Sequence, residues 1–193
     1  EGITVIVKSY KVPILINRIA YRFFRWAKAI RSYRYAAMLK EIGVGSPAPV
    51  AYHVEYSPLH MRRSYFVSLE SECPYTYREI GKFQGNKTEL LRSIAQTTAK
   101  LHDNGILHKD YSAGNILFKE TQGGFDVEII DLNRIRFGNV DLETGCRNFS
   151  RLPGTPDMLN VLADEYARCR GFNADRCREI LQQTHGEDNP YIQ

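Results

Sequence analysis

The stretch from His108 to Asn133, HKDYSAGNILFKETQGGFDVEIIDLN, constrains this chain more than any other. Asp110 and Asn115 stand five positions apart in it, in a short polar segment. Gly114 precedes Asn115, which favours a tight loop because glycine accepts turn conformations at low cost. The sequence therefore predicts a loop that holds a carboxylate and an amide close together.

Two apolar runs, residues 116–118 and 125–130, lie on either side of a Gly-Gly pair and predict a β-hairpin. Such a hairpin would bring Asp131, at the exit of the second strand, back beside Asn115. Carboxylate and amide oxygens are hard donors that suit Mg²⁺ carried by substrate phosphates. The spacing thus indicates a site that places metal-bound nucleotide phosphates beside a hydroxyl group.

Composition sets the broad class. A chain of 193 residues can form one core or two small lobes that share a cleft, and 43% apolar with 25% charged residues is typical of a soluble globular protein. The four cysteines lack zinc-site spacing and fit a reducing compartment, so we expect a cytoplasmic protein. Neither a span-length apolar run nor a secretory signal is visible. Because the chain starts at Glu1 and enters a strand almost at once, we expect further sequence upstream.

The remaining elements follow from periodicity and capping residues. A β-branched run over residues 3–7 predicts a strand that ends at Lys8, and the segment from Pro13 to Ile42 predicts two helices with a bend near residues 28–31. Gly43 then ends the helical segment. Further strands are expected at residues 50–55 and 63–69, and further helices at residues 88–102 (capped by Thr88), 141–152 (Asp141), 155–171 (Thr155-Pro156) and 173–186 (Asn173).

Positive charge is concentrated at the start of the chain. Residues 1–40 hold nine Lys or Arg against one acid, whereas the remainder has a net charge of −4. Two interpretations stay open: a solvated helix face, or peripheral contact of residues 8–40 with an anionic membrane surface or sugar-phosphate, which would place the protein on the inner face of the cytoplasmic membrane. Nucleic acid is not expected as a partner, because no repeating pattern of base-stacking aromatics accompanies the charge.

The motifs resemble those of a known superfamily. His108-Lys109-Asp110 with Asn115 is similar to the catalytic loop of protein-kinase-like phosphotransferases, and Asp131-Leu132-Asn133 stands where those enzymes carry a metal-binding Asp-Phe-Gly. Over nearly the whole chain the sequence resembles the lipopolysaccharide kinase family, the Kdo and heptose kinase branch. The segments that carry this resemblance are VKSY, LKEIG, SPAPVAY, SYFVS, HKDYSAGNILF, IIDLNRIRFG and CRNFSRL.

The resemblance implies an α+β, protein-kinase-like bilobal fold. Residues 1–67 would be a partial N-lobe whose first strands and glycine-rich loop are not in this chain. Residues 68–75 would be the hinge, and residues 76–193 a mainly helical C-lobe.

The resemblance also implies a reaction: transfer of the γ-phosphoryl group of ATP, with Mg²⁺, to a hydroxyl of a glycolipid or sugar acceptor, most commonly a lipopolysaccharide core sugar such as Kdo or heptose. Asp110 would accept or orient that hydroxyl, and Asn115 with Asp131 would hold Mg²⁺. Lys8 would contact the α- and β-phosphates, and His108 would brace the loop without chemistry. The hinge residues expected to meet adenine are Ser68, Leu69 and Glu70.

The chain departs from the family pattern in three places. No glycine-rich loop precedes Lys8, and Arg34 stands where the helix glutamate partner of that lysine is expected, with Glu41 as the next acid. Lys109 replaces the arginine of the usual loop, and Leu132-Asn133 replaces Phe-Gly. These departures leave an alternative open, a pseudokinase or nucleotide-sensing interaction module without turnover.

Overall fold

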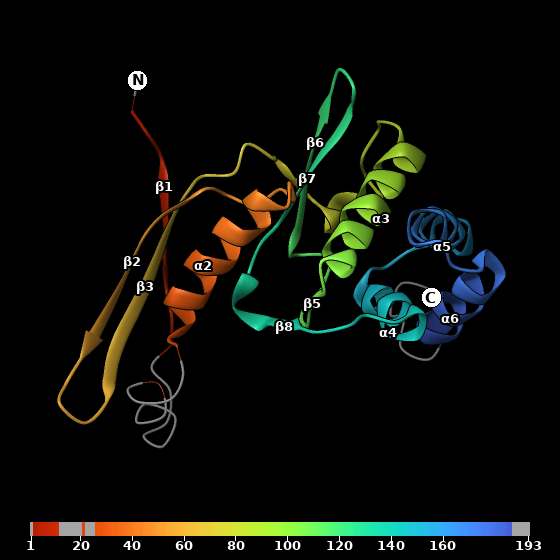
Figure 1. Ribbon diagram of the computed structural model, residues 1–193. Helices are drawn as coiled ribbons and strands as arrows, with labels where there is room; N and C mark the ends of the chain where they lie inside the picture. Colours follow the sequence, from red (N-terminus) through yellow and green to blue (C-terminus); the bar gives the residue numbers. More distant parts are fainter. Residues whose placement is uncertain (1, 12–20, 22–25, 187–193) are drawn as a thin grey trace. The chain divides into compact units, whose positions relative to one another are not determined.

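The computed structural model describes residues 2–11, 21 and 26–186, which divide into two compact units. The N-unit comprises Glu1–Ser71 together with Asp131–Asn133, and the C-unit comprises Glu72–Ile130 and Arg134–Gln193. Figure 1 shows the elements of each unit. The short segment with Asp131 therefore belongs to the N-unit although the sequence on both sides of it belongs to the C-unit.

In its described residues the N-unit is a three-stranded antiparallel sheet on which a helix packs (Figure 1). Strand β3 (Met61–Leu69) lies in the middle, between β1 (Val5–Ser9) and β2 (Pro49–Tyr56). Helix α2 (Lys28–Glu41) packs on β2 and β3. Every residue of β1 is exposed, whereas β3 contains buried, partly buried and exposed residues. This difference is expected between an edge strand and a central strand.

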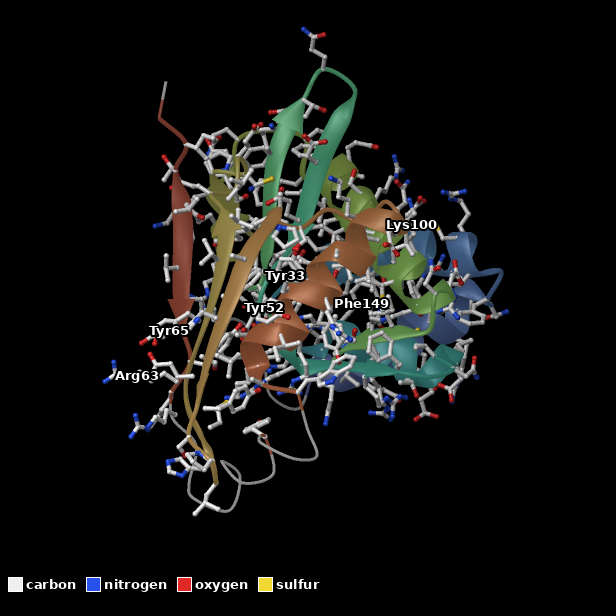
Figure 2. The ribbon with its side chains drawn as sticks, turned by 60° about the vertical axis from the view of Figure 1, so that its left-hand side comes forward. Tyr33, Tyr52, Arg63, Tyr65, Lys100 and Phe149 are labelled. Carbon is white, nitrogen blue, oxygen red and sulfur yellow. The ribbon has the colours of Figure 1, made fainter. Side chains whose placement is uncertain are left out.

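Small and apolar side chains seat α2 on the sheet. Tyr33 of the helix points at Tyr52 of β2, with ring centroids 5.2 Å apart in an edge-on arrangement (Figure 2). Tyr10, just after β1, bonds through its hydroxyl to Ser32 Oγ at 2.6 Å. Burial raises the pKa of Tyr10 to about 12, so this hydroxyl stays protonated at neutral pH. The buried helix residues are Ala29, Ser32, Ala36 and Leu39.

The helix boundaries agree with the sequence expectations as far as they can be compared. Helix α2 begins at Lys28, inside the predicted bend, and the chain leaves it at Gly43, whose φ of 66° is left-handed. The first half of the predicted helical segment, residues 12–20 and 22–25, lies outside the described residues, and with it Arg18, Arg22 and Arg25 of the basic stretch. The two strands expected at residues 50–55 and 63–69 are present.

The C-unit contains two small antiparallel sheets. In one, β6 (Ile116–Thr121) and β7 (Gly124–Ile129) form the predicted hairpin, and β4 (Tyr75–Thr76) pairs with β6. In the other, β5 (Ile106–His108) pairs with β8 (Ile135–Phe137). Strand β5 leads into the Asp110 loop, and β8 follows Asn133. Their pairing therefore holds together the two ends of the stretch from His108 to Asn133.

Helices make up the rest of the C-unit (Figure 1): α3 (Lys87–Asp103), α4 (Leu142–Arg147), α5 (Pro156–Arg170) and α6 (Ala174–Gly186), with 3-10 turns at Tyr77–Glu79, Leu132–Arg134 and Asn148–Arg151. Helix α3 packs against α5 and β7, and α6 packs against α4 and α5. The expected buried face of α3 is confirmed, with Leu90, Leu91, Ile94, Ala95, Thr98 and Leu101 all buried.

Three predicted caps are confirmed and one is wrong. Asp141, Thr155 and Asn173 accept hydrogen bonds from the first turns of α4, α5 and α6. Helix α3 is instead capped by Asn86, whose Oδ1 accepts from the backbone of Glu89 at 3.1 Å. The cap expected two residues later is a first-turn helical residue. The helix predicted through residue 152 stops at Arg147 and continues as a 3-10 turn.

Buried aromatic residues tie the helices to the Asp110 loop. Tyr111, in that loop, is almost fully buried, and its hydroxyl bonds to Thr98 Oγ1 of α3 at 2.7 Å. Burial raises the pKa of Tyr111, so the phenol remains neutral. Phe149 packs edge-on against both Tyr111 and Tyr166 of α5. The Asp110 loop is therefore packed against the core of the C-unit through Tyr111, which restricts the motion of the loop.

Within the described ranges no helix combines the length and apolarity that crossing a bilayer requires.

Candidate active site

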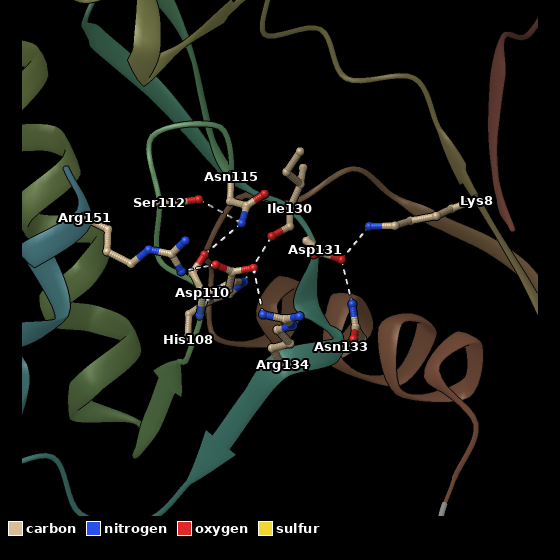
Figure 3. A network of polar contacts seen from close by, with 10 residues as sticks. All are labelled: Lys8, His108, Asp110, Ser112, Asn115, Ile130, Asp131, Asn133, Arg134 and Arg151. Atoms are coloured by element: carbon tan, nitrogen blue, oxygen red, sulfur yellow. Dashed lines mark hydrogen bonds and ion pairs between the residues drawn. The ribbon is translucent and has the colours of Figure 1, made fainter. Parts of the chain in front are cut away.

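The loop from Asp110 to Asn115 is held by its own hydrogen bonds (Figure 3). Ser112 N–H donates to the Asp110 carbonyl at 2.9 Å, and Asn115 N–H donates to the Ser112 carbonyl at 2.8 Å. The Asn115 side-chain amide also donates to the Asp110 carbonyl at 2.8 Å. With its nitrogen used in this way, Asn115 keeps its side-chain oxygen for another ligand.

His108 also holds this loop in place through hydrogen bonds of its ring. Its Nδ1 accepts the N–H of Asp110 at 3.2 Å, and its Nε2 donates to the Ile130 carbonyl at 3.1 Å. An acceptor at Nδ1 and a donor at Nε2 define the neutral tautomer with the proton on Nε2. Ile130 N–H in turn donates to the Asn115 carbonyl at 3.0 Å. The histidine therefore connects the loop to the end of the hairpin, which is a structural role.

A chain of side-chain hydrogen bonds links α5 to the loop. Arg170 donates to the Tyr166 hydroxyl at 2.8 Å, and that hydroxyl bonds to His102 Nδ1 at 2.8 Å. His102 Nε2 bonds to the Asn148 oxygen at 3.1 Å, and the Asn148 amide donates to the His108 carbonyl at 3.0 Å. Burial lowers the pKa of His102 to about 4, so the ring is neutral and can accept from the tyrosine.

Two arginines contact the Asp110 carboxylate (Figure 3). Arg151 donates to Oδ1 in a short ion pair, and Arg134 Nη1 lies 3.3 Å from Oδ2. Asp110 is 17% exposed, whereas the two arginines are 58% and 60% exposed. Lys109 N–H donates to the Arg134 carbonyl at 3.0 Å, which fixes the backbone of that arginine beside the loop. Both carboxylate oxygens of the expected catalytic residue are thus engaged by cations.

Asp131 has an unusual backbone. Its φ of 59° is left-handed, and among the described residues it is the only non-glycine residue with positive φ. Such conformations cost energy and occur preferentially at functional sites. Within the N-unit, Asp131 Oδ1 accepts from Lys8 Nζ in a short ion pair and from the Asn133 amide at 2.6 Å (Figure 3). Asn133 is 6% exposed, so this turn is held by a buried amide.

The partner of Lys8 is therefore Asp131. Arg34, at the position expected for a helix glutamate, stacks its guanidinium on Trp26 with 3.9 Å to the ring centroid and does not contact Lys8. Glu41 is exposed at the end of α2, and no contact joins it to Lys8 among the described residues. Helix α2 thus supplies no acidic partner to Lys8, and the residue that pairs with the lysine is Asp131, in the turn after β7.

The three expected hinge residues lie at the end of β3. Ser68 pairs with Ile6 and Leu69 with Val5, and Leu69 N–H donates to the Ala48 carbonyl at 2.9 Å. Glu70 N–H donates to the Thr4 carbonyl at 3.1 Å. The amides of Leu69 and Glu70 therefore already have backbone partners.

Each unit contains one side-chain oxygen of a kind that magnesium takes. In the C-unit Asn115 keeps its side-chain oxygen, because its amide nitrogen is the group that bonds to the loop. In the N-unit Asp131 keeps Oδ2, because its contacts with Lys8 and Asn133 use Oδ1. Amide and carboxylate oxygens are both hard donors that suit Mg²⁺ carried by phosphates. The described residues hold no cluster of three or more His, Cys, Asp or Glu that would bind a metal by itself.

Sequence reasoning missed the groups that surround Asp110. Arg151 lies 41 positions from Asp110 and Arg134 lies 24 positions away, and neither spacing corresponds to a recognisable pattern. Asn148 was also missed because it ends a helix, a place where asparagine is common without function. Contacts between residues so far apart in the sequence can be identified only from the packed structure.

A family model identifies the family of the chain, and two curated relatives match parts of it. Residues 8–152, well over half of the chain, match the model of the Lipopolysaccharide kinase (Kdo/WaaP) family. The chain is 24% identical over 143 residues, 74% of its length, to the serine/threonine-protein kinase pkn2 of Myxococcus xanthus. It is 25% identical over 117 residues, 61% of its length, to a probable bifunctional tRNA threonylcarbamoyladenosine biosynthesis protein of Methanocaldococcus jannaschii. The chain spans only 16% and 19% of these two relatives.

Solved structures show the same fold. The structure of WaaP in complex with acyl carrier protein is similar with a TM-score of 0.60 and 19% identity, over 82% of this chain and 74% of that one. The bifunctional kinase-methyltransferase WbdD is similar with a TM-score of 0.57 and 13% identity, over 98% of this chain and 42% of that one. The predicted α+β, protein-kinase-like fold with an incomplete N-lobe is confirmed by these similarities and by the small sheets.

The family match covers Lys8, the Asp110 loop, Asp131 and Arg151. The chain therefore belongs to the Lipopolysaccharide kinase (Kdo/WaaP) family.

Proposed function

We propose that the protein transfers the γ-phosphoryl group of ATP to a hydroxyl on a lipopolysaccharide core sugar, Kdo or heptose. Family membership supports a kinase, and Asp110 is the residue that the family resemblance assigns to the acceptor hydroxyl. The observations that carry the proposal are made within each unit: the Asp110 loop is held by its own hydrogen bonds, and the left-handed Asp131 contacts Lys8. These are the groups that phosphoryl transfer requires, because its catalysis consists mostly of positioning and charge stabilisation.

In the proposed reaction the acceptor oxygen forms a bond to the γ-phosphorus while the bond from that phosphorus to the bridging β-phosphate oxygen breaks. ADP leaves, and the hydroxyl proton passes to the Asp110 carboxylate. Lys8 contacts the α- and β-phosphates. Asn115 and Asp131 would hold Mg²⁺, which neutralises charge on the phosphates when it is bound.

Three binding assignments belong to the same proposal. Backbone groups of the segment Ser68, Leu69 and Glu70 meet the adenine. These residues form part of the hinge in the proposed division into an N-lobe at residues 1–67, a hinge at residues 68–75 and a C-lobe at residues 76–193. The protein works in the cytoplasm, where ATP is available, and the basic residues 8–40 attach it peripherally to anionic lipid.

The test is transfer of label from γ-labelled ATP, with Mg²⁺, to a lipopolysaccharide core extract by the full-length protein. We expect labelled core sugar from the wild-type protein and none from Asp110→Ala. Equal labelling by the two proteins would refute the proposal.

A second candidate is a nucleotide-sensing module without turnover. Two observations favour it: cations engage both oxygens of Asp110, and α2 supplies no acid to Lys8. This candidate expects no labelled core sugar, even where Mg²⁺ and ATP bind the full-length protein and stabilise it against heat. Labelling by the wild-type protein that Asp110→Ala abolishes would exclude it.

A further inference from the structure

The structure explains the glycine before Asn115 by lack of space and not by backbone conformation. Gly114 is not among the glycines whose φ is positive, so its backbone is one that other residues adopt. A Cβ on Gly114 would, however, lie 2.5 Å from Arg78 Nη2 and 2.7 Å from Arg78 Cζ. Both distances are shorter than an ordinary carbon contact. The guanidinium of Arg78 therefore occupies the place that a side chain at position 114 would take.

Arg78 turns the flat face of its guanidinium toward this glycine. The same Cβ would lie 3.0 Å from Nε, farther than from Cζ, whereas a guanidinium that met Gly114 edge-on would hold its carbon farther away than its nitrogens. Among the described residues Arg78 makes no hydrogen bond or ion pair. What the side chain gives to the loop is therefore close packing of a rigid, planar group on the backbone.

The turn that carries Arg78 is itself firmly held. Tyr77 at its start is fully buried in the C-unit core. Thr76 and Glu79 form a capping box, in which Glu79 Oε2 accepts the Thr76 N–H at 2.8 Å and the Thr76 hydroxyl at 3.1 Å. The backbone of Arg78 thus has a fixed position from which its side chain reaches Gly114.

The same turn is also tied to the chain on the other side of Asn115. Thr76 of β4 pairs with Leu117 of β6, two residues after Asn115. Gly114, on which Arg78 packs, directly precedes Asn115. The backbone around Asn115 is therefore held after it by strand pairing and before it by the guanidinium, while the Asn115 amide donates to the Asp110 carbonyl (Figure 3).

We infer that Arg78 is a positioning residue for Asn115. By lying flat on Gly114 it fixes the backbone from which the Asn115 side chain starts, so that the side-chain oxygen stays in the orientation in which it can take Mg²⁺. Arg78 acts through this packing and touches neither the metal nor the nucleotide. The inference rests on the proposed function, and it makes positions 78 and 114 one functional unit.

The experiment measures binding of the non-hydrolysable imido analogue of ATP to the full-length protein. Isothermal titration calorimetry at increasing Mg²⁺ concentration gives the concentration for half-maximal nucleotide binding, and titration in EDTA gives the Kd without metal. The proteins are the wild type, Arg78→Ala, Arg78→Lys, Gly114→Ala and the double variant Arg78→Ala with Gly114→Ala. Steady-state transfer to core oligosaccharide is measured on the same proteins.

Two matched controls accompany these variants. Arg92 is an exposed arginine of α3 that pairs with Glu89, and Gly123 has open space where a Cβ would be, so Arg92→Ala and Gly123→Ala should bind as the wild type does. An alanine at position 114 meets the end of a flexible side chain, so it displaces Arg78 and leaves the backbone in place. Thermal unfolding of each variant confirms that it is folded.

Arg78→Ala removes the guanidinium and Gly114→Ala displaces it. Each should raise the Mg²⁺ concentration for half-maximal binding about 10-fold, at the lower end of the effect of groups that orient a metal ligand. The double variant should show the same rise and not the product of two rises, because both substitutions remove one contact. Arg78→Lys keeps the charge without the flat face and should behave as Arg78→Ala does. The Kd in EDTA should stay within about twofold of wild type throughout, which a general loss of loop structure would not allow.

Several results would overturn the inference: rises that multiply in the double variant, an Arg78→Lys protein that matches the wild type, unchanged Mg²⁺ dependence in both single variants, or an effect confined to the KM for the oligosaccharide. A wild-type protein without Mg²⁺-dependent nucleotide binding would overturn it as well. A wild-type protein that binds the analogue with Mg²⁺ but labels no core sugar would refute the proposed function alone, because the calorimetry still decides the role of Arg78.

Discussion

Lys8 and Asp131 are 123 positions apart in the sequence and form an ion pair within one compact unit. The contact joins the end of an exposed edge strand to a turn whose backbone is left-handed. Because α2 offers no acid to the lysine, Asp131 alone balances its charge among the described residues. When Mg²⁺ and ATP bind, we expect the lysine to exchange this carboxylate for phosphate oxygens, since Asp131 is then needed by the metal.

The first prediction concerns that lysine. Lys8→Met should weaken binding of ATP in the presence of Mg²⁺ at least 10-fold, because charge-assisted hydrogen bonds to phosphate are lost. Isothermal titration calorimetry on the full-length protein measures this. Lys11→Met, three residues further along and exposed, is the control and should bind as the wild-type protein does. Equal affinities of both variants would remove Lys8 from the nucleotide site.

The second prediction concerns the His108 brace. His108→Phe keeps a ring of similar size but leaves the Asp110 N–H and the Ile130 carbonyl without their imidazole partner. The loop would shift by a fraction of an ångström, so kcat should fall about 10- to 100-fold while the Kd for ATP stays within about twofold. Steady-state kinetics with parallel calorimetry separate the two quantities. His53→Phe, an exposed histidine on β2, should change neither; an unchanged kcat in His108→Phe would show that the brace is dispensable.

The third prediction is a pH dependence. The folded protein lowers the pKa of His102 to about 4 from an ordinary value of 6.5. Between pH 4 and pH 6.5 this histidine binds a proton in the unfolded chain but not in the folded chain. The free energy of unfolding therefore falls as the pH falls from 6.5 to 4. Above pH 6.5 the histidine is neutral in both states and has no effect on the pH dependence. The full effect is about 3 kcal/mol, at 1.36 kcal/mol per pKa unit. Urea unfolding of the wild-type protein and His102→Gln at pH 7.5, 6 and 5 measures it.

His102→Gln should flatten the pH dependence over this range, because glutamine does not titrate. The exposed His53→Gln should keep the full wild-type slope. A His102→Gln protein with the same slope as the wild-type protein would contradict the burial of a neutral imidazole at this position.

The fourth prediction concerns packing behind the loop. A Cβ on Gly145 would lie 2.0 Å from the Tyr166 hydroxyl and 3.3 Å from His102 Nδ1. Gly145→Ala must displace the tyrosine and leave His102 without its partner, so we expect about 3 kcal/mol of destabilisation. Gly123→Ala, with open space around it, should change stability by less than about 0.5 kcal/mol.

Chemical denaturation measures both variants. Adding Tyr166→Phe to Gly145→Ala removes the clashing oxygen, so the second substitution should cost less in the alanine background than in the wild-type protein. Additive effects of the two substitutions would contradict the contact.

How much of the site the sequence could predict depends on how local each contact is. Asp110 and Asn115 share one loop, and Asp131 ends the hairpin that begins at Asn115, so spacing and apolar pattern were enough to find them. The hairpin and most helices followed from the same local rules. The contact of Arg151 with Asp110 depends on how the 3-10 turn after α4 packs, which no short pattern encodes.

Two errors have specific physical causes. The α3 cap was misplaced because Asn86 and Thr88 are both good capping residues, and only the backbone shows which side chain meets the first-turn amides. The helix predicted after Asp141 was too long because Asn148 uses its amide on His102 and His108, and the chain tightens into a 3-10 turn there. In both places a side-chain hydrogen bond, which the sequence pattern does not reveal, determines where the helix begins or ends.

The central claim is that Asp110 is the residue that receives the acceptor proton. The most direct measurement is kcat for ATP-dependent transfer to core oligosaccharide by Asp110→Asn, with the Kd for ATP determined on the same protein. Asp126→Asn, an exposed acid on β7 that lies 3.7 Å from Lys119, is the control. The account predicts a fall in kcat of about 10²- to 10⁴-fold with the Kd for ATP within about threefold of wild type. A kcat for Asp110→Asn equal to that of the control would contradict it.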